Sequence, residues 1–206
     1  MTVIGVLALQ GAFIEHVKKL HELGVVVREV RLPADLEEID GLIIPGGEST
    51  TIGKLIDRFE LRQPILDRAH AGMPIWGTCA GMILLGQEVD ADTQARSQPL
   101  LHLMDIGVRR NAFGSQLDSF ETELDFPVLG PEPLPAVFIR APIISWIGPE
   151  VEVLAKLPDG RIVAARQDQY LATSFHPELT ADNRLHAWFV ALAAQASRRP
   201  AAQATS

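Results

Sequence analysis

A strand, a tight turn and a helix are predicted in succession within the stretch Met73-Pro74-Ile75-Trp76-Gly77-Thr78-Cys79-Ala80-Gly81-Met82-Ile83-Leu84-Leu85. The apolar run that opens it is typical of a strand buried on both faces, as in a parallel sheet. The same order of apolar run, glycine turn and helical pattern starts at Val3 and again at Gly41. This alternation predicts an α/β domain with a mostly parallel sheet covered by helices.

Further elements are predicted on both sides of this stretch. Apolar residues at helical spacing favour helices over 13–23, 61–70 and 183–196, and apolar runs favour strands over 25–30 and 170–175. Between about Leu103 and Arg166 the pattern changes to short β-like runs at 106–108, 137–139, 151–154 and 162–164. We expect these runs to form a mixed or antiparallel extension and not a second domain. The chain is thus predicted to be one domain over residues 1–196 with a disordered tail over 197–206.

Composition excludes several classes of protein. The chain has 206 residues, of which 47% are hydrophobic and 21% charged, so it can build a sizeable core. No apolar run approaches the roughly 18 to 20 residues of a membrane span, and the first ten residues lack the features of a secretory signal. We therefore expect a soluble, cytoplasmic protein. The net charge of -8 argues against nucleic acid or anionic membranes as partners.

Cys79 is the only cysteine, which excludes an intramolecular disulfide and a four-cysteine zinc site. It lies at the predicted turn between a strand and a helix, with glycine two residues away on either side. Such a turn leaves room for a substrate carbonyl, and the following helix directs its first N–H groups at the sulfur. The turn therefore indicates a nucleophilic cysteine. The alternative is a buried cysteine that acts as a small apolar residue.

A cysteine nucleophile needs a base, and the base needs an orienting group. His176 follows a predicted buried strand at the edge where α/β folds place their sites. If the chain stays extended there, as Pro177 favours, Glu178 projects to the same side as His176 and can hold its ring. A plain turn at the end of the strand is the alternative. Solvent-exposed side chains are expected for the other histidines, His16, His21, His70, His102 and His186.

Two further groups are candidates for substrate binding. The segment Gly46-Gly47-Glu48-Ser49-Thr50-Thr51 lacks the spacing of a phosphate-binding loop, but its glycine N–H groups can form an oxyanion hole. The alternative is a strand-to-helix turn capped by Ser49 or Thr50. Guanidinium groups that can bind a carboxylate are present at Arg109, Arg110 and Arg140, and plain surface arginines are the alternative there.

Six motifs occur in order between residue 3 and about residue 190. They are Leu9-Gln10-Gly11-Ala12 with Glu15-His16, Pro45-Gly46-Gly47-Glu48-Ser49-Thr50-Thr51, Gly77-Thr78-Cys79-Ala80-Gly81, Arg110-Asn111 with Phe113-Gly114, Phe138-Ile139-Arg140-Ala141-Pro142 and Ser174-Phe175-His176-Pro177-Glu178-Leu179. Together they resemble the PdxT/SNO family, the glutaminase subunits of pyridoxal 5'-phosphate synthase. These are class I (triad) glutamine amidotransferases, and the resemblance implies their three-layer, flavodoxin-like fold with helices on both faces of the sheet.

The resemblance also implies a reaction and its residues. Cys79 would attack the side-chain amide of L-glutamine, His176 would act as base and then as acid toward ammonia, and Glu178 would orient His176. Residues implied to contact glutamine are Gly47, Glu48, Ser49, Arg110, Ile139 and Arg140. Backbone amides near Gly47 and Ala80 are candidates for the oxyanion hole. Neither a metal nor a cofactor is expected.

A partner is implied as well. In the family, ammonia passes to a synthase subunit of the PdxS/SNZ type within a large hetero-oligomer, and that subunit combines it with ribose 5-phosphate and glyceraldehyde 3-phosphate. Glutaminase activity there depends on docking to the partner. One departure is Ser115, where the family usually has a basic residue, so a contact near the partner or the ammonia exit is in doubt.

Three other functions remain open. The chain can be a glutaminase subunit that serves another acceptor, such as the imidazole-forming enzyme of histidine synthesis. It can be a regulatory module on the same fold that performs no turnover. A stand-alone cysteine hydrolase of the γ-glutamyl hydrolase type is the third alternative, and it would be active without a partner.

Overall fold

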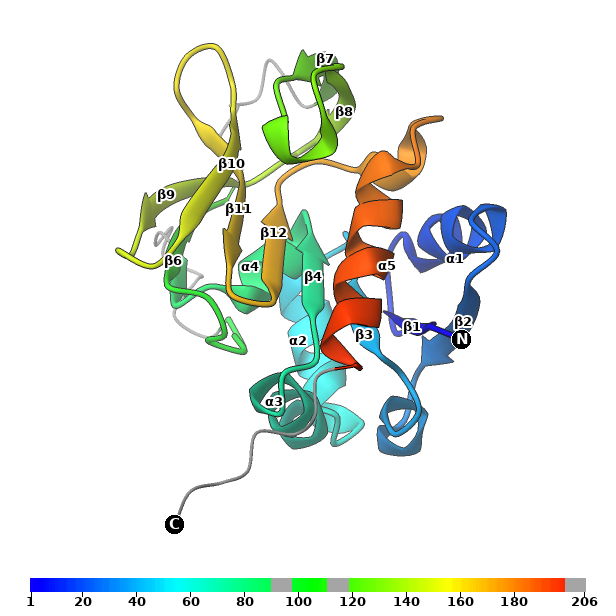
Figure 1. The fold of residues 1–206 in the computed structure, drawn as a ribbon. Coiled ribbons are helices and arrows are strands. Elements are labelled where there is room, and N and C mark those ends of the chain that lie inside the picture. Colours follow the sequence, from blue (N-terminus) through cyan, green and yellow to red (C-terminus); the bar gives the residue numbers. More distant parts are fainter. Residues whose placement is uncertain (90–97, 111–118, 199–206) are drawn as a thin grey trace.

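A ten-stranded sheet forms the centre of the computed structural model, which describes residues 1–89, 98–110 and 119–198 (Figure 1). One half of the sheet is parallel and has the strand order β2-β1-β3-β4-β12. These strands are β1 (Val3–Leu7), β2 (Val26–Val30), β3 (Gly41–Ile44), β4 (Ile75–Thr78) and β12 (Tyr170–Thr173). All five coincide with predicted strands to within a few residues.

The other half of the sheet is mixed. It continues from β12 through β11, β9, β6 and β5, with β10 paired to β11, and the pairs β11–β12, β11–β9, β6–β9 and β10–β11 are antiparallel. The bounds are β5 (Glu88–Val89), β6 (Ile106–Arg109), β9 (Ile143–Ile147), β10 (Glu152–Lys156) and β11 (Ile162–Gln167). The predicted mixed extension is therefore confirmed.

A separate two-stranded sheet corrects one part of that prediction. Strand β8 (Leu134–Ile139) contains the run predicted at 137–139, but it pairs with β7 (Ser119–Leu124) and not with the main sheet. Its alternate residues Leu134, Ala136 and Phe138 are buried, whereas a strand inside the main sheet would be covered on both faces.

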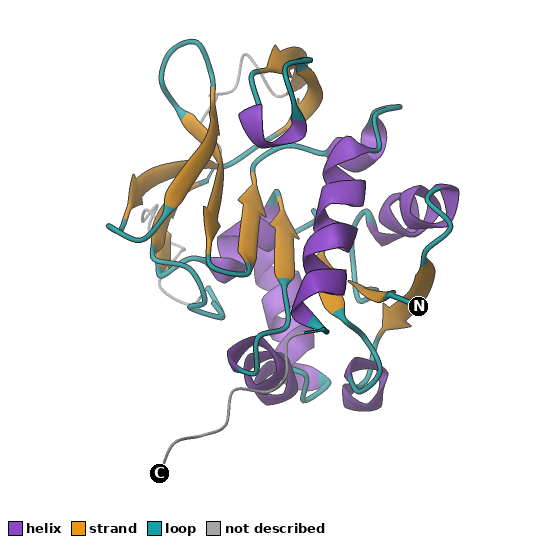
Figure 2. Cartoon of the chain, viewed as in Figure 1, coloured by secondary structure: helices purple, strands orange, loops and turns teal. Residues whose placement is uncertain are grey.

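Helices cover both faces of the main sheet (Figure 2). Helices α1 (Phe13–Glu22) and α5 (Arg184–Ala196) pack on one face. On the other face lie α2 (Ser49–Arg58), α3 (Arg62–His70) and α4 (Ala80–Leu85). Within the described residues, short 3-10 turns lie at Pro33–Leu36, Pro127–Leu129 and Pro177–Leu179. The predicted three-layer α/β fold is confirmed.

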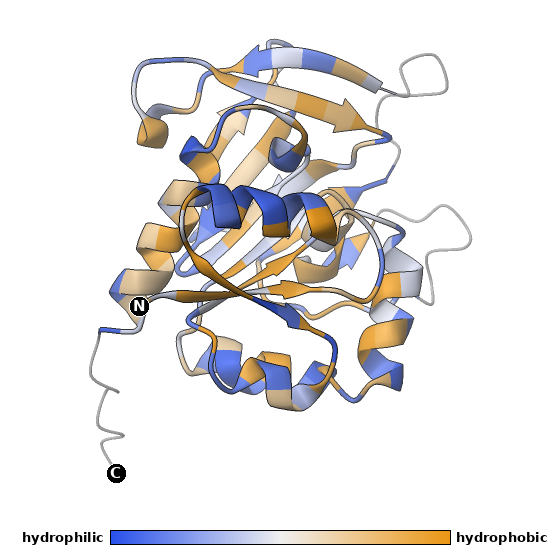
Figure 3. Ribbon diagram, turned by 90° about the vertical axis from the view of Figure 1, so that its right-hand side faces the viewer, coloured by the Kyte–Doolittle hydropathy of each residue, from blue (hydrophilic) through white to orange (hydrophobic). Residues whose placement is uncertain are grey.

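The central strands are apolar throughout because both of their faces are buried against helices. Ile4 and Trp76 belong to the core shared with α1 and α5, whereas Leu7 and Ile75 belong to the core shared with α2, α3 and α4. Because successive strand residues face opposite sides, both sides must be apolar. Figure 3 shows hydrophobic residues along the central strands and hydrophilic ones on outward helix surfaces.

No helix within the described ranges has the length and apolar character needed to cross a membrane. Helix α5 ends at Ala196, the predicted end of the domain. Most of the predicted tail, residues 199–206, lies outside the described residues, as does the segment 111–118 that includes Ser115. The single domain and the disordered tail therefore stay predictions.

Candidate active site

Cys79 lies on a sharp turn between β4 and α4. Its backbone has φ 49° and ψ -104°, a strained conformation for a residue that carries a Cβ atom. The turn is tight enough that a Cβ atom on Gly77 would lie 2.5 Å from the carbonyl group of Gly81. The side chain is 8% exposed, so the thiol is mostly shielded but reachable. The geometry is that of a nucleophile elbow.

His176 and Glu178 follow β12, the parallel neighbour of β4, so they emerge at the same edge of the sheet as Cys79. His176 Nδ1 lies 2.6 Å from Glu178 Oε1, and both side chains are buried. The expected extended chain is wrong, because Pro177–Leu179 forms a 3-10 turn. Proline fits the first position of such a turn, and the turn brings the carboxylate back to the ring.

The pKa of His176 is raised to about 10. Burial alone would lower the pKa, but hydrogen bonds to Cys79 and Glu178, together with their negative charges, outweigh burial. Burial likewise opposes ionisation of Glu178, yet His16 and His176 hold the pKa of this carboxyl below its usual value. A protonated His176 ring is thus favoured between the sulfur of Cys79 and the carboxylate of Glu178.

A cavity of about 580 Å³ opens over the elbow. It is lined by Ala12, Gly47, Glu48, Ser49, Cys79, Ala80, Ile83, Arg110, Ile139, Arg140, Pro142, His176 and Leu179. All the residues predicted to contact glutamine line this cavity, and so does Ala80. Arg109, the third candidate arginine, ends β6 with an exposed side chain and is not part of this lining.

Glu48 also has a structural role besides lining the cavity. Its carboxylate accepts hydrogen bonds from the backbone N–H groups of Thr50 and Thr51, so Glu48 caps α2, and the alternative of a cap by Ser49 or Thr50 is wrong. Arg110 Nη2 lies 3.1 Å from the same carboxylate. Partial burial would raise the pKa of Glu48, but these donors and the charge of Arg110 lower it to about 2. Glu48 thus holds Arg110 at the cavity wall.

Two glutamines support this wall and were not singled out from the sequence. Gln10 Oε1 accepts the backbone N–H of Glu48 at 2.9 Å. Gln98 Oε1 lies 3.0 Å from Ser49 Oγ and 3.3 Å from Arg110 Nη1. Gln10 lies in one of the six motifs, so the sequence offered a way to identify it as a site residue. Gln98 lies in none of them.

The expectation of exposed histidines is correct for His21, His70 and His102 and wrong for the other two. His16 and His186 are 0% exposed. His16 shares its spacing with Phe13 and Leu20 on the inward face of α1, so the apolar periodicity already contained a signal of burial.

Known proteins match this chain over nearly all of its length. The model of the SNO glutamine amidotransferase family matches residues 6–195. A protein named pyridoxal 5'-phosphate synthase subunit PdxT from Herpetosiphon aurantiacus is 64% identical over 189 residues, which are 92% of this chain and 99% of the relative. A relative of the same name from Dehalococcoides mccartyi is 58% identical, covering 92% of this chain and 96% of its own. A crystal structure described as a glutamine amidotransferase superposes with a TM-score of 0.86 at 47% identity, over 93% of this chain and 98% of that one.

Proposed function

The chain belongs to the SNO glutamine amidotransferase family, and from this we propose that it is the glutaminase subunit of a pyridoxal 5'-phosphate synthase. It hydrolyses L-glutamine to L-glutamate and ammonia with Cys79, His176 and Glu178. The observation that carries the proposal is that His176, hydrogen-bonded to Glu178, lines the same cavity as the only thiol of the chain.

The reaction proceeds in two balanced steps. The Cys79 thiolate attacks the side-chain amide carbon, and the C–N bond breaks as protonated His176 gives its Nε2 proton to the leaving nitrogen, which departs as ammonia. Water then attacks the γ-glutamyl thioester, and His176 takes one of its protons. The C–S bond breaks, the γ-carboxyl group gives its remaining proton to solvent as glutamate leaves, and the Cys79 thiolate beside protonated His176 is restored.

The cavity walls supply the remaining groups. Backbone N–H groups of Gly47 and Ala80 are the candidates for the oxyanion hole, where losing one donor costs about 10² to 10³ in rate. Arg110, held by Glu48, and Arg140 offer guanidinium groups for the α-carboxylate of glutamine. Ser49 and Ile139 complete the contacts.

Ammonia is consumed by a partner. The relatives are named as subunits of pyridoxal 5'-phosphate synthase, so the acceptor is the PdxS/SNZ-type synthase subunit of that enzyme, in a large hetero-oligomer. The cytoplasm suits the assembly because a catalytic thiol must remain reduced. Exposed Leu179 and Ile139 at the mouth of the cavity offer apolar surface for docking.

A partner-dependent glutaminase assay tests the proposal. Glutamate release is measured with and without the synthase subunit, for the wild type and for Cys79→Ala. We expect strong stimulation by the partner and a loss of at least about a thousandfold in the variant, because removal of a nucleophile leaves only binding and oxyanion stabilisation. Full activity of Cys79→Ala would refute the mechanism.

Labelling and co-purification separate the alternatives. 6-Diazo-5-oxo-norleucine should label Cys79 in the wild type when the partner is present, and its failure to do so would favour a regulatory module. Strong activity without any partner would favour a stand-alone hydrolase. Stable association with a histidine-pathway synthase instead would refute the assignment to pyridoxal phosphate synthesis.

A further inference from the structure

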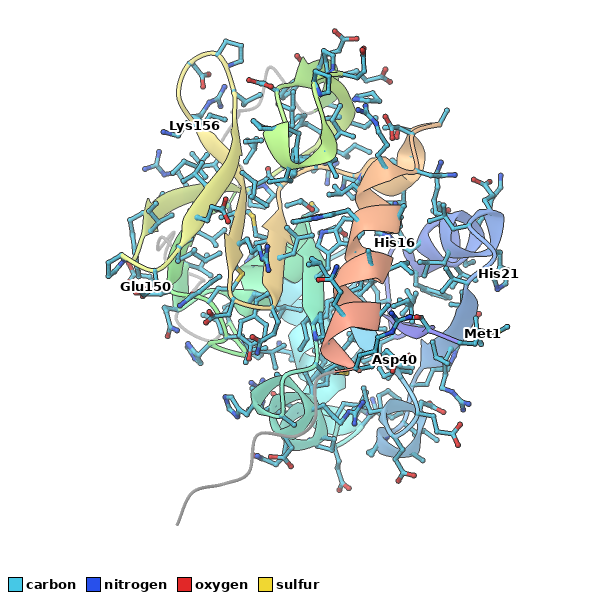
Figure 4. All side chains as sticks on the ribbon, in the orientation of Figure 1. Met1, His16, His21, Asp40, Glu150 and Lys156 are labelled. Carbon is cyan, nitrogen blue, oxygen red and sulfur yellow. The ribbon has the colours of Figure 1, made fainter. Side chains whose placement is uncertain are left out.

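Two buried histidines lie directly behind the site. His16 projects from α1 and His186 from α5, and His16 Nδ1 lies 2.9 Å from His186 Nε2. Both rings pack against Trp76 of β4, with ring centroids 5.8 and 4.9 Å away. Figure 4 places His16 on the inner side of α1 near α5 and His21 at the outer end of the same helix.

His16 also reaches the site itself. Its Nε2 atom lies 3.4 Å from Glu178 Oε2 and 3.2 Å from Thr78 Oγ1. Glu178 Oε2 is buried and has no hydrogen-bond partner among the described residues. The ring of His16 thus brings a polar nitrogen close to this oxygen, while the other carboxylate oxygen, Oε1, holds His176.

The proton positions of this pair follow from what each neighbour can accept. A carboxylate only accepts hydrogen bonds, so a bare Nε2 on His16 would face it with a lone pair. If Nε2 carries the proton, Nδ1 is an acceptor and receives the Nε2–H of His186. His186 Nδ1, which has no partner among the described residues, is then an acceptor and not a buried unpaired donor. If Nδ1 of His16 carried the proton instead, His186 would carry its own proton on Nδ1, where the buried N–H has no partner. That arrangement has the higher free energy.

We propose that His16 is a positioning residue for the reaction: its Nε2–H, hydrogen-bonded to Thr78 Oγ1 and 3.4 Å from Glu178 Oε2, stabilises the carboxylate in the position from which Oε1 orients His176, while His186 fixes the tautomer of His16. The triad thus continues inward as a chain of five residues, Cys79, His176, Glu178, His16 and His186. This inference rests on the proposed function, because it deepens the role of Glu178.

The surrounding charges agree with neutral rings. Burial lowers the pKa of His16 despite the nearby charge of Glu178, and His176 lowers it further, whereas Glu15 raises it. Burial lowers the pKa of His186 well below its usual value, aided by His16 and by Lys19. A neutral His16 ring places its N–H beside Glu178 without adding a second positive charge behind the imidazolium of His176.

The test compares two amide substitutions that place their N–H groups differently. His16→Gln puts an amide near the position of Nε2, toward Glu178, whereas His16→Asn puts it near Nδ1, toward His186. His21→Gln, on the exposed face of the same helix, is the matched control. With the synthase partner present, kcat and KM for glutamine are measured between pH 5 and 10, and the fold is monitored by circular dichroism.

We expect His16→Gln to stay within about threefold of the wild type and His16→Asn to lose about 10- to 100-fold in kcat with little change in KM, as typical for groups that orient reacting residues. Without the N–H of His16 close to Oε2 the anion of Glu178 is less stabilised, so the pKa of Glu178 rises. The acid limb of kcat/KM should then move up by about one pH unit in His16→Asn only. A loss of packing would lower activity at every pH without this shift.

A second readout needs neither partner nor glutamine. Because Cys79 is the only cysteine, the rate of alkylation by iodoacetamide reports its thiolate alone, and its pH profile should shift in His16→Asn but not in His16→Gln. If both His16 variants behave like His21→Gln in both assays, the positioning role is wrong while the proposed function stands. If Cys79→Ala retains glutaminase activity, the proposed function itself fails.

Discussion

His176 is expected to be protonated at neutral pH, because its pKa is raised to about 10. Titration of the His176 ring by NMR should show a midpoint near pH 10 in the wild type. In Cys79→Ala the midpoint should fall, because one hydrogen-bond partner and one negative charge are lost. A midpoint near 6.5 in the wild type would contradict the ion pair.

The same shift has a consequence for stability. The folded pKa of His176 lies above the unfolded value of about 6.5. The stabilisation from its bound proton is therefore complete below pH 6.5 and is lost as the pH rises toward 10. Denaturant unfolding between pH 6 and 10 measures this effect, and the His176→Ala variant should lack it.

Gly46 lies so close to the site that any side chain there would disturb it. A Cβ atom on Gly46 would be 2.5 Å from His176 Cε1 and 3.3 Å from Cys79 Cβ. We expect Gly46→Ala to lower glutaminase kcat by about 100-fold or more, because displacements of 1 Å in a reacting group have effects of this size.

Gly24→Ala provides the control for Gly46→Ala. Gly24 has φ +69°, and a Cβ atom there would meet nothing within 4 Å. The substitution should lower the free energy of unfolding by about 1 kcal/mol through backbone strain and leave kcat unchanged. Equal kcat values in the two variants would show that His176 moves aside without cost.

At the scale of elements, Glu48 both stabilises the start of α2 and holds Arg110 at the cavity wall. Glu48→Ala removes the acceptor for the N–H groups of Thr50 and Thr51 and the carboxylate that holds Arg110. We expect a loss of about 1 kcal/mol in the free energy of unfolding and a higher KM for glutamine. The exposed Glu38→Ala, which breaks only a surface pair with Arg28, should change neither measurably.

The lowered pKa of Glu48 also predicts how the free energy of unfolding changes with pH. Its folded pKa of about 2 lies below the unfolded value near 4.5, so its contribution to stability is present above pH 4.5 and is lost as the pH falls toward 2. Acid unfolding of Glu48→Ala should therefore begin from a lower stability but show a weaker pH dependence than the wild type.

Buried parallel strands and amphipathic helices were predictable because their apolar patterns are strong. Strand β7 was missed because its residues alternate between exposed and half-buried positions and contain two glutamates. The contact between Glu48 and Arg110 could not be predicted either, because the two residues are 62 positions apart in the sequence.

The proposed triad residues were singled out from the elbow, the histidine after a strand and the family motifs, but their geometry was not predictable. The 3-10 turn at Pro177 and the burial of His16 depend on contacts between elements. His16 lies on a helix face that also carries Phe13 and Leu20. The helical spacing of these residues therefore indicated a buried side chain, whereas the polarity of histidine wrongly suggested an exposed one. A polar side chain on an apolar face calls for a partner, and Glu178 and His186 fill that role.

At the scale of the whole molecule, the order of the strands decides where the site forms. Strands β4 and β12 are parallel neighbours, so their carboxyl ends place Cys79 and His176 side by side. Ligands bind at this edge in open α/β sheets. Helices α1 and α5 supply the buried histidines behind the site, whereas α2 and α4 supply the cavity wall and the elbow, so both helical layers contribute to one centre.

The neighbouring positions of β4 and β12 also determine when activity can arise during synthesis. Trp76 Nε1 of β4 lies 3.0 Å from Thr173 Oγ1 of β12, a residue 97 positions later in the chain. A nascent chain that ends shortly after Cys79 therefore lacks both His176 and strand β12, which precedes His176 and pairs with β4. Nearly the whole domain must leave the ribosome before Cys79 and His176 can come together, so an incomplete chain lacks the complete site.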